Sequence, residues 1–100
     1  MSSPEFRLRL SHKARRDLTD ILRYTAENWG KAQLLVYRDL VDHALETIRL
    51  NPAIGHRHED LPETHRVYLV GSHVIVYRAL TTGIAVVRIL HQRMSLGDRV

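Results

Sequence analysis

The chain has 100 residues, the size of one ordinary domain, and its helix and strand signals continue from end to end, so we expect a single domain over residues 1–100. It contains no cysteine, which excludes a disulfide framework, cysteine-ligated zinc and thiol catalysis. A net charge of +4, from 15 basic and 11 acidic residues, favours an anionic partner such as nucleic acid or an acidic protein segment.

Charged residues interrupt the apolar runs of the chain. The N-terminal region carries charges throughout and contains no apolar segment as long as that of a signal peptide. Arg78 and Arg88 break the longest apolar runs of the C-terminal third, which leaves no candidate membrane span. We therefore expect a soluble, cytoplasmic protein that has no membrane partner.

The N-terminal third predicts a strand and then a helix. Over residues 6–10, apolar residues alternate with arginines, which is the period of a half-buried strand. Ser11 is a suitable N-cap, and apolar residues then recur at helical spacing as far as Gly30, which suits the position after a helix. We therefore expect an amphipathic helix between Ser11 and Gly30.

Residues 31–50 predict a second amphipathic helix, with one apolar stripe along its length. Asn51 and Pro52 end it, because the residue before a proline disfavours the α conformation. A single glycine joins the two helices, so they should form an αα-hairpin. Residues 51–64 are rich in proline, histidine and charged residues, and predict a surface loop.

The last third predicts a three-stranded antiparallel meander. Its β-branched and aromatic residues fall in three runs, Val67–Val70, Val74–Leu80 and Ile84–Leu90. Gly71 and Ser72 between the first two runs can form a two-residue turn, and the first of them is a glycine, as a type II′ hairpin turn requires. Three residues separate the second pair, and the last of them, Gly83, is expected to adopt a left-handed conformation.

The element order β-α-α-β-β-β predicts an α+β fold in which the helical hairpin packs on one face of an antiparallel sheet. The N-terminal strand should pair with a meander strand, either at the edge of the sheet or between other strands. The second face of the sheet is expected to stay uncovered. Residues 95–100 are expected to form a short mobile tail.

The polar residues allow three chemical interpretations besides a nuclease. His56 and His58 could start a metal site with Glu59 or His65, but they lack a characteristic downstream partner, so an exposed polar loop with no metal or other cofactor is favoured. The start of the first helix is basic, but its mixed acidic residues favour a solvated face over a DNA-reading helix. A groove that holds an acidic protein segment is a further possibility.

A nuclease is the alternative that assigns specific catalytic roles to residues. Arg66, Arg88 and His91 could bind phosphate groups on the open sheet face, and His91 could act as a general acid or base in RNA cleavage by a 2′-hydroxyl group. Strand alternation does not gather these groups, because it places Arg88 and His91 on opposite faces. The favoured interpretation is that the arginines solubilise the exposed face.

Several sequence pieces occur together in a fixed order between Ser11 and Met94. They are Ala14-x-x-Asp17-Leu18-x-x-Ile21-x-x-Tyr24, Trp29-Gly30, Tyr37, Leu40, Asn51-Pro52-x-x-Gly55, Arg66, Gly71-Ser72-His73-Val74-Ile75-x-Tyr77 and Val87-Arg88-Ile89-Leu90-His91-Gln92-Arg93-Met94. Together they resemble the ParE toxins of type II toxin–antitoxin modules, which belong to the RelE/ParE superfamily. The resemblance implies the same β-α-α-β-β-β fold.

The resemblance also implies a function and partners. It implies a ParD-like antitoxin whose C-terminal segment wraps the toxin and whose ribbon-helix-helix domain binds operator DNA, often in a complex of two toxins with two antitoxins. It further implies that the free toxin inhibits DNA gyrase, blocks replication and catalyses nothing. The RelE branch, a ribosome-dependent mRNA endonuclease, is the alternative, but its lysines near the start of the meander are absent here, where the only lysines are Lys13 and Lys31.

Two sets of site residues follow as hypotheses. Acidic residues of the antitoxin are expected to meet arginines along the hairpin groove, namely Arg16, Arg23, Arg66 and Arg78. The contact with gyrase is expected at the C-terminal strand and tail, with Arg88, His91, Arg93 and Met94.

Overall fold

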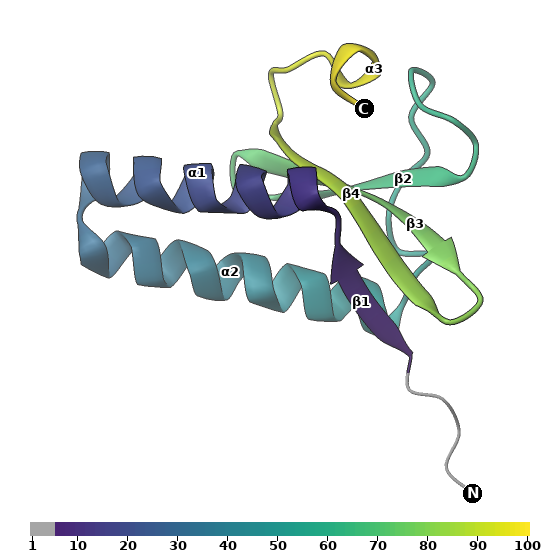
Figure 1. Ribbon diagram of the computed structural model, residues 1–100, viewed down its shortest axis with the longest axis horizontal. Coiled ribbons are helices and arrows are strands. Elements are labelled where there is room, and N and C mark those ends of the chain that lie inside the picture. The colour runs from purple at the N-terminus through teal and green to yellow at the C-terminus, as the bar shows by residue number, and fades with distance from the viewer. Residues whose placement is uncertain (1–5) are drawn as a thin grey trace, which may run out of the picture.

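The structure is a computed structural model that describes residues 6–100, so residues 1–5 of the predicted domain lie outside the described part. The elements follow the predicted order, with one short helix added at the C-terminal end (Figure 1). They are β1 (Arg7–Leu10), α1 (His12–Trp29), α2 (Lys31–Leu50), β2 (His65–Val70), β3 (His73–Leu80), β4 (Gly83–His91) and α3 (Leu96–Arg99).

The strands form one four-stranded sheet in the order β1-β4-β3-β2. Strands β2, β3 and β4 make the predicted antiparallel meander, and β1 pairs with a meander strand, as expected. The pairing of β1 with β4 is parallel, so the sheet is mixed. A parallel pair requires a crossover, and here the helical hairpin and the rest of the meander supply it.

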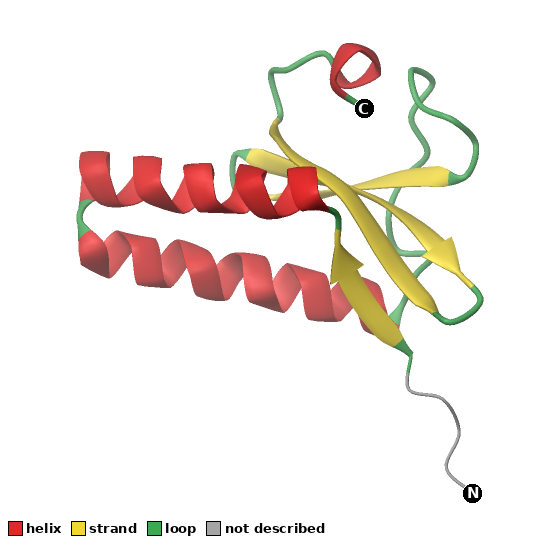
Figure 2. Ribbon diagram, viewed as in Figure 1, coloured by secondary structure: helices red, strands yellow, loops and turns green. Residues whose placement is uncertain are grey.

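The helical hairpin lies beside the sheet as two antiparallel helices (Figure 2). Ser11 is the predicted N-cap: its Oγ accepts the backbone N–H of Ala14 at 3.0 Å and donates to the carbonyl of Val87 at 2.7 Å. Gly30 separates the helices with φ of 90°, a conformation that only glycine adopts readily. None of the helices within residues 6–100 has the length and apolar character of a membrane span.

The main core lies between the hairpin and one face of the sheet. Its largest fully buried side chains come from α2 and from the two central strands, and removing them from water is the main source of stability. Residues of this core include Val41, Ile48, Ile75, Tyr77, Ile84, Val86 and Ile89.

The second face of the sheet is not left uncovered, so that expectation is wrong. Leu61 from the loop before β2 and Leu96 from α3 pack on an apolar patch formed by Val67, Val74, Val76 and Leu90. Residues 95–100 are therefore not a mobile tail, because Leu96 is only 7% exposed. The Arg88 side chain adds a second attachment by donating to the carbonyl of Arg99 at 2.7 Å.

The two hairpin turns use glycine for different reasons. Gly71 has φ of 55° and Ser72 does not have a positive φ, as a type II′ turn requires. The expectation for Gly83 is wrong: its φ is not in the left-handed region, and it pairs with Leu80 as a strand residue. A Cβ at Gly83 would lie 1.8 Å from the carbonyl oxygen of Arg7. The close approach of β1 explains this glycine.

Candidate functional site

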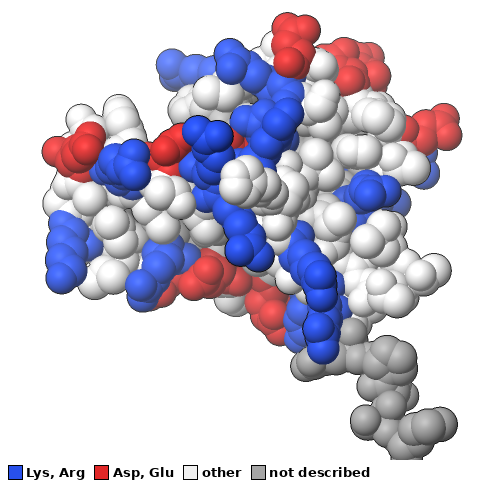
Figure 3. Space-filling view, viewed as in Figure 1, with Lys and Arg blue, Asp and Glu red and all other residues white. Residues whose placement is uncertain are grey.

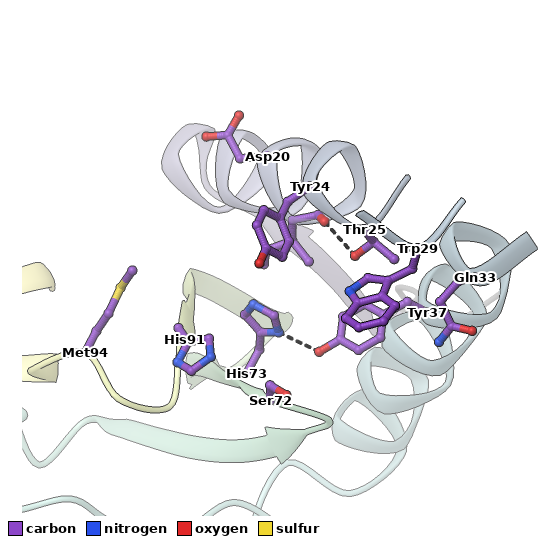
Figure 4. A pocket seen from close by; sticks show the side chains of 11 residues that line it. Asp20, Tyr24, Thr25, Trp29, Gln33, Tyr37, Ser72, His73, His91 and Met94 are labelled. Carbon is purple, nitrogen blue, oxygen red and sulfur yellow. Dashed lines mark hydrogen bonds between the residues drawn. The ribbon is translucent and has the colours of Figure 1, made fainter. Parts of the chain in front are cut away.

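A groove opens between the helical hairpin and the end of the sheet where β2 turns into β3 and β4 ends (Figure 4). We call it the hairpin groove; its cavity volume is about 900 Å³. Most of its lining is apolar or aromatic. The lining residues are Asp20, Ile21, Tyr24, Thr25, Trp29, Gln33, Tyr37, Ser72, His73, His91 and Met94.

Two large aromatic side chains stand exposed on the α1 side of this groove. Trp29 is 71% exposed and Tyr24 is 63% exposed, and Met94 faces them from the C-terminal side with 40% exposure. Large aromatic side chains that remain in water around a concave surface are typical of an interface with another protein. The groove therefore has the chemistry of a docking site.

The floor of the groove is a row of three ring side chains. The hydroxyl of Tyr37 donates to the carbonyl of Val70 at 3.2 Å and contacts Nδ1 of His73 at 2.5 Å. The His73 ring in turn packs edge-on against His91, with 5.4 Å between ring centroids. The phenol carries one proton, so it donates either to Val70 or to Nδ1 of His73, and the tautomer of His73 decides which.

Burial favours the uncharged forms of two of these rings, Tyr37 and His73. It raises the pKa of the Tyr37 phenol above its ordinary value of 10.0. Burial, with a smaller contribution from His91, lowers the pKa of His73 below its ordinary value of 6.5. A partner that covers Tyr37 and His73 would therefore meet two hydrogen-bonded rings whose uncharged forms are favoured, which keeps the desolvation cost there small.

The four arginines predicted to meet an antitoxin do not form one cluster. Arg16 and Arg23 are exposed on α1, and Arg23 lies 3.8 Å from Asp20 at the rim of the groove. Arg66 faces the helical side of the sheet and donates to the carbonyl of Gly55 at 2.8 Å. Arg78 is exposed on the opposite face of the sheet.

The residues predicted to contact gyrase do not form one cluster either. His91 and Met94 line the hairpin groove, and Arg93 is exposed between them. Arg88 is committed to Asp17 on α1 through two hydrogen bonds of 2.7 and 2.8 Å, and this carboxylate raises its pKa. The trio proposed for catalysis, Arg66, Arg88 and His91, thus occupies three different environments.

The sequence did not suggest Tyr24 and Trp29 as site residues, although the lengths of the elements contained a signal. Helices of 18 and 20 residues are about 27 and 30 Å long, whereas four strands side by side span only about 15 to 20 Å. The hairpin must therefore extend beyond the sheet, as it does in Figure 1. Apolar residues near its tip are left without cover.

The histidines of the loop before β2 do not form a ligand cluster. The backbone of His56 bridges to Val67 in the sheet, while Nδ1 of His58 accepts the backbone N–H of Asp60 at 3.1 Å. Across residues 6–100, no group of three or more histidine and acidic side chains is arranged to hold a metal ion.

A sequence profile described as "ParE toxin of type II toxin-antitoxin system, parDE" matches residues 8–96. The chain belongs to the ParE toxin family. This ParE-family chain is 36% identical over 87 residues to Toxin ParE1 of Caulobacter vibrioides, which covers 87% of this chain and 90% of that protein. It is also 36% identical over 88 residues to Toxin ParE1 of Mycobacterium tuberculosis, and this match covers 87% of this chain and 90% of that protein.

Solved structures share the fold of this ParE-family chain. One is a chromosomal ParDE toxin–antitoxin system from P. aeruginosa, with a TM-score of 0.75, 18% identity, and 89% of this chain and 98% of that chain covered. Another is the RelBE2 toxin–antitoxin complex of Mycobacterium tuberculosis, with a TM-score of 0.60, 20% identity, and 90% and 100% covered. At these identities the likeness concerns the fold, and it confirms the predicted RelE/ParE-like architecture.

Proposed function

We propose that this chain acts as one toxin domain whose cognate ParD-like antitoxin occupies the hairpin groove, and that the free toxin inhibits DNA gyrase without catalysing a reaction. Membership of the ParE family supports the toxin role. The observation that carries the docking proposal is the pair of exposed aromatic residues, Tyr24 and Trp29, above the floor of the groove.

The groove suits a segment that folds as it binds. An amphipathic antitoxin segment would place apolar side chains between Trp29 and Met94, and the hydrophobic contacts would offset the entropy lost on ordering it. Arg16 and Arg23 lie about two turns apart on α1, where they can meet acidic residues of the segment. The operator sequence would then be recognised only through the antitoxin.

The same geometry suggests how neutralisation works. His91 and Met94, which we expect to contact gyrase, line the hairpin groove, and Arg93 lies between them. An antitoxin seated in the groove would therefore cover the surface that contacts the target. A nuclease receives less support, because Arg88 is held by Asp17 and Arg66 by the carbonyl of Gly55, so neither side chain is directed toward His91.

A pair of assays on one preparation tests this function. Purified toxin is added to a gyrase supercoiling reaction and, separately, to a ribosome-programmed mRNA cleavage reaction. We expect loss of supercoiling with accumulation of cleaved DNA, intact mRNA, and full recovery when the antitoxin is added. Cleaved mRNA with unaffected gyrase would contradict the proposal and favour the endonuclease.

A further inference from the structure

A second hollow lies on the outer face of the sheet, at the end opposite to the hairpin groove. Arg7 and Arg9 of β1 border it, and Gly83 and Ala85 of β4 lie in its lining; its volume is about 490 Å³. Arg78 of β3 stands beside it, since Arg78 pairs with Ala85 in the sheet. We call these five residues the arginine cleft.

The strand register fixes the arrangement of the arginines. Ala85 pairs with Arg9 on one side and with Arg78 on the other, so the three residues form a row across the sheet. Two strand spacings separate the outer pair, which places their Cα atoms about 10 Å apart. Between them lies only the small side chain of Ala85, so a ligand can approach the sheet closely at this point.

The charges of the cleft are not neutralised within the described part of the chain. Arg7, Arg9 and Arg78 are exposed, and none of them forms an ion pair with a carboxylate of residues 6–100. Arg88, by contrast, forms an ion pair with Asp17. His65 pairs with Arg78 in the sheet, and burial together with that positive charge lowers its pKa.

The lining indicates which anion would fit. It contains no aromatic ring on which an unpaired base could stack, as single-stranded nucleic acids require. Leu80 is its one exposed large apolar side chain, so an acidic peptide would find little to anchor it. A regular polyanion that is recognised through its charges alone matches the cleft better.

We propose that the arginine cleft binds the sugar–phosphate backbone of duplex DNA. Arginine forks bind phosphate oxygens in pairs, and Arg78 lies about 10 Å from the arginines of β1, so the two sides can reach both strands across a minor groove that is about 6 Å wide. Figure 3 shows basic side chains gathered over β1 and the N-terminal end of α1, which extends the positive surface around the cleft. The activity goes beyond the toxin function, because the hairpin groove lies at the other end and on the other face.

Fluorescence anisotropy of a labelled duplex of about 20 base pairs tests the inference, with salt varied from about 50 to about 200 mM. We expect the free toxin to bind with a dissociation constant between about 1 and 100 μM, as non-specific DNA binding does. The triple variant Arg7→Gln, Arg9→Gln, Arg78→Gln should bind at least about tenfold more weakly. The slope of log affinity against log salt should fall by about 2.7, which is 0.9 for each lost phosphate contact.

Two further variants separate the cleft from net charge and from misfolding. The triple Lys31→Gln, Arg38→Gln, Arg57→Gln removes the same charge from exposed sites outside the cleft and should change affinity by less than about twofold. Replacing the three cleft arginines by lysine should keep the salt slope, because each point charge remains. Circular dichroism confirms that every variant is folded.

Four results would overturn the inference. They are no binding at the lowest salt, an equal loss in both glutamine triples, tighter binding of a single strand of the same length, and displacement of the duplex by polyglutamate at equal charge concentration. The last would assign the cleft to an acidic peptide. None of these results depends on gyrase or on the antitoxin, so the toxin function is tested separately.

Discussion

The hairpin groove and the arginine cleft are built on the same sheet, but by opposite means. The groove lies where the helices extend beyond the sheet, so its aromatic side chains have no intramolecular cover. The cleft lies where an edge strand joins the sheet beside a glycine, so its floor is backbone and its walls are charged. One hollow is suited to apolar contacts and the other to a polyanion, and the difference arises from element length and strand register.

The largest expected effect comes from breaking the ion pair that joins α1 to β4, between the hairpin and the sheet that the two regions have in common. Asp17 accepts two hydrogen bonds from Arg88 and a third from the backbone N–H of Ile89 at 3.0 Å. Its side chain is 15% exposed and that of Arg88 is 18% exposed. Asp17→Ala leaves the largely buried guanidinium of Arg88 without its carboxylate partner. The substitution should therefore lower the free energy of unfolding by about 3 kcal/mol in urea titrations.

Asp20→Ala is the matched control for Asp17→Ala. The ion pair between Asp20 and Arg23 is solvent-exposed on both sides, so its loss should change the free energy of unfolding by less than about 1 kcal/mol. Similar losses in the two variants would show that the Asp17–Arg88 pair does not hold α1 to the sheet.

A substitution with a smaller expected effect should distort the arginine cleft and leave the hairpin groove unchanged. Gly83→Ala places a methyl group against the backbone of Arg7, so β1 must shift, at a cost of about 2 kcal/mol in the free energy of unfolding. Gly97→Ala, whose Cβ would lie 3.3 Å from the nearest atom, should cost less than about 0.5 kcal/mol. Antitoxin affinity should survive in the folded Gly83 variant, and its loss would show that the two regions are not independent.

A substitution in the hairpin groove should weaken antitoxin binding and leave the arginine cleft unchanged. Trp29→Ala removes a side chain that is 71% exposed, so the free energy of unfolding should change by less than about 0.5 kcal/mol. Antitoxin affinity should fall by about tenfold or more, or about 1.4 kcal/mol, in isothermal titration calorimetry. Leu50→Ala, at the other end of α2 and 70% exposed, is the control and should bind normally.

The smallest expected effect is a pH dependence that each region contributes separately. The pKa of His73 in the groove and that of His65 beside the cleft are both lowered in the folded state, mainly by burial. The unfolded chain therefore binds protons more readily, so stability is lost as pH falls through 6.5 and below.

Urea titrations between about pH 7.5 and about pH 5.5 measure this dependence. The His73→Gln and His65→Gln variants should each show a flatter decline than the wild type. A decline that neither substitution alters would assign the pH dependence to other groups.

The sequence predicted the elements well because its local signals were strong. Alternation in residues 6–10, the Ser11 cap, Gly30 and the meander runs each agree with the structure. Gly83 was misinterpreted because a glycine near a turn has the same sequence pattern whether it supplies a positive φ or makes room for another strand. Only the three-dimensional register distinguishes the two cases.

The parts of the site that the sequence missed are non-local. Asp17 and Arg88 are 71 residues apart, and no local pattern pairs them. The packing of Leu96 depends on an apolar patch that three strands create together. Trp29 fits an apolar helical stripe, but whether anything covers it depends on how far the sheet extends. The arginines assigned to antitoxin contact stay a prediction.

The parallel pairing of β1 with β4 affects when the chain can fold during its synthesis on the ribosome. Leu10 must wait for Val86, its pairing partner, to be synthesised before the sheet can close. At about 5 to 20 residues per second, translation leaves the first strand unpaired for several seconds. During that interval the sheet is incomplete, so the hairpin groove, which His91 at the end of β4 helps to line, cannot form before β4 has been synthesised.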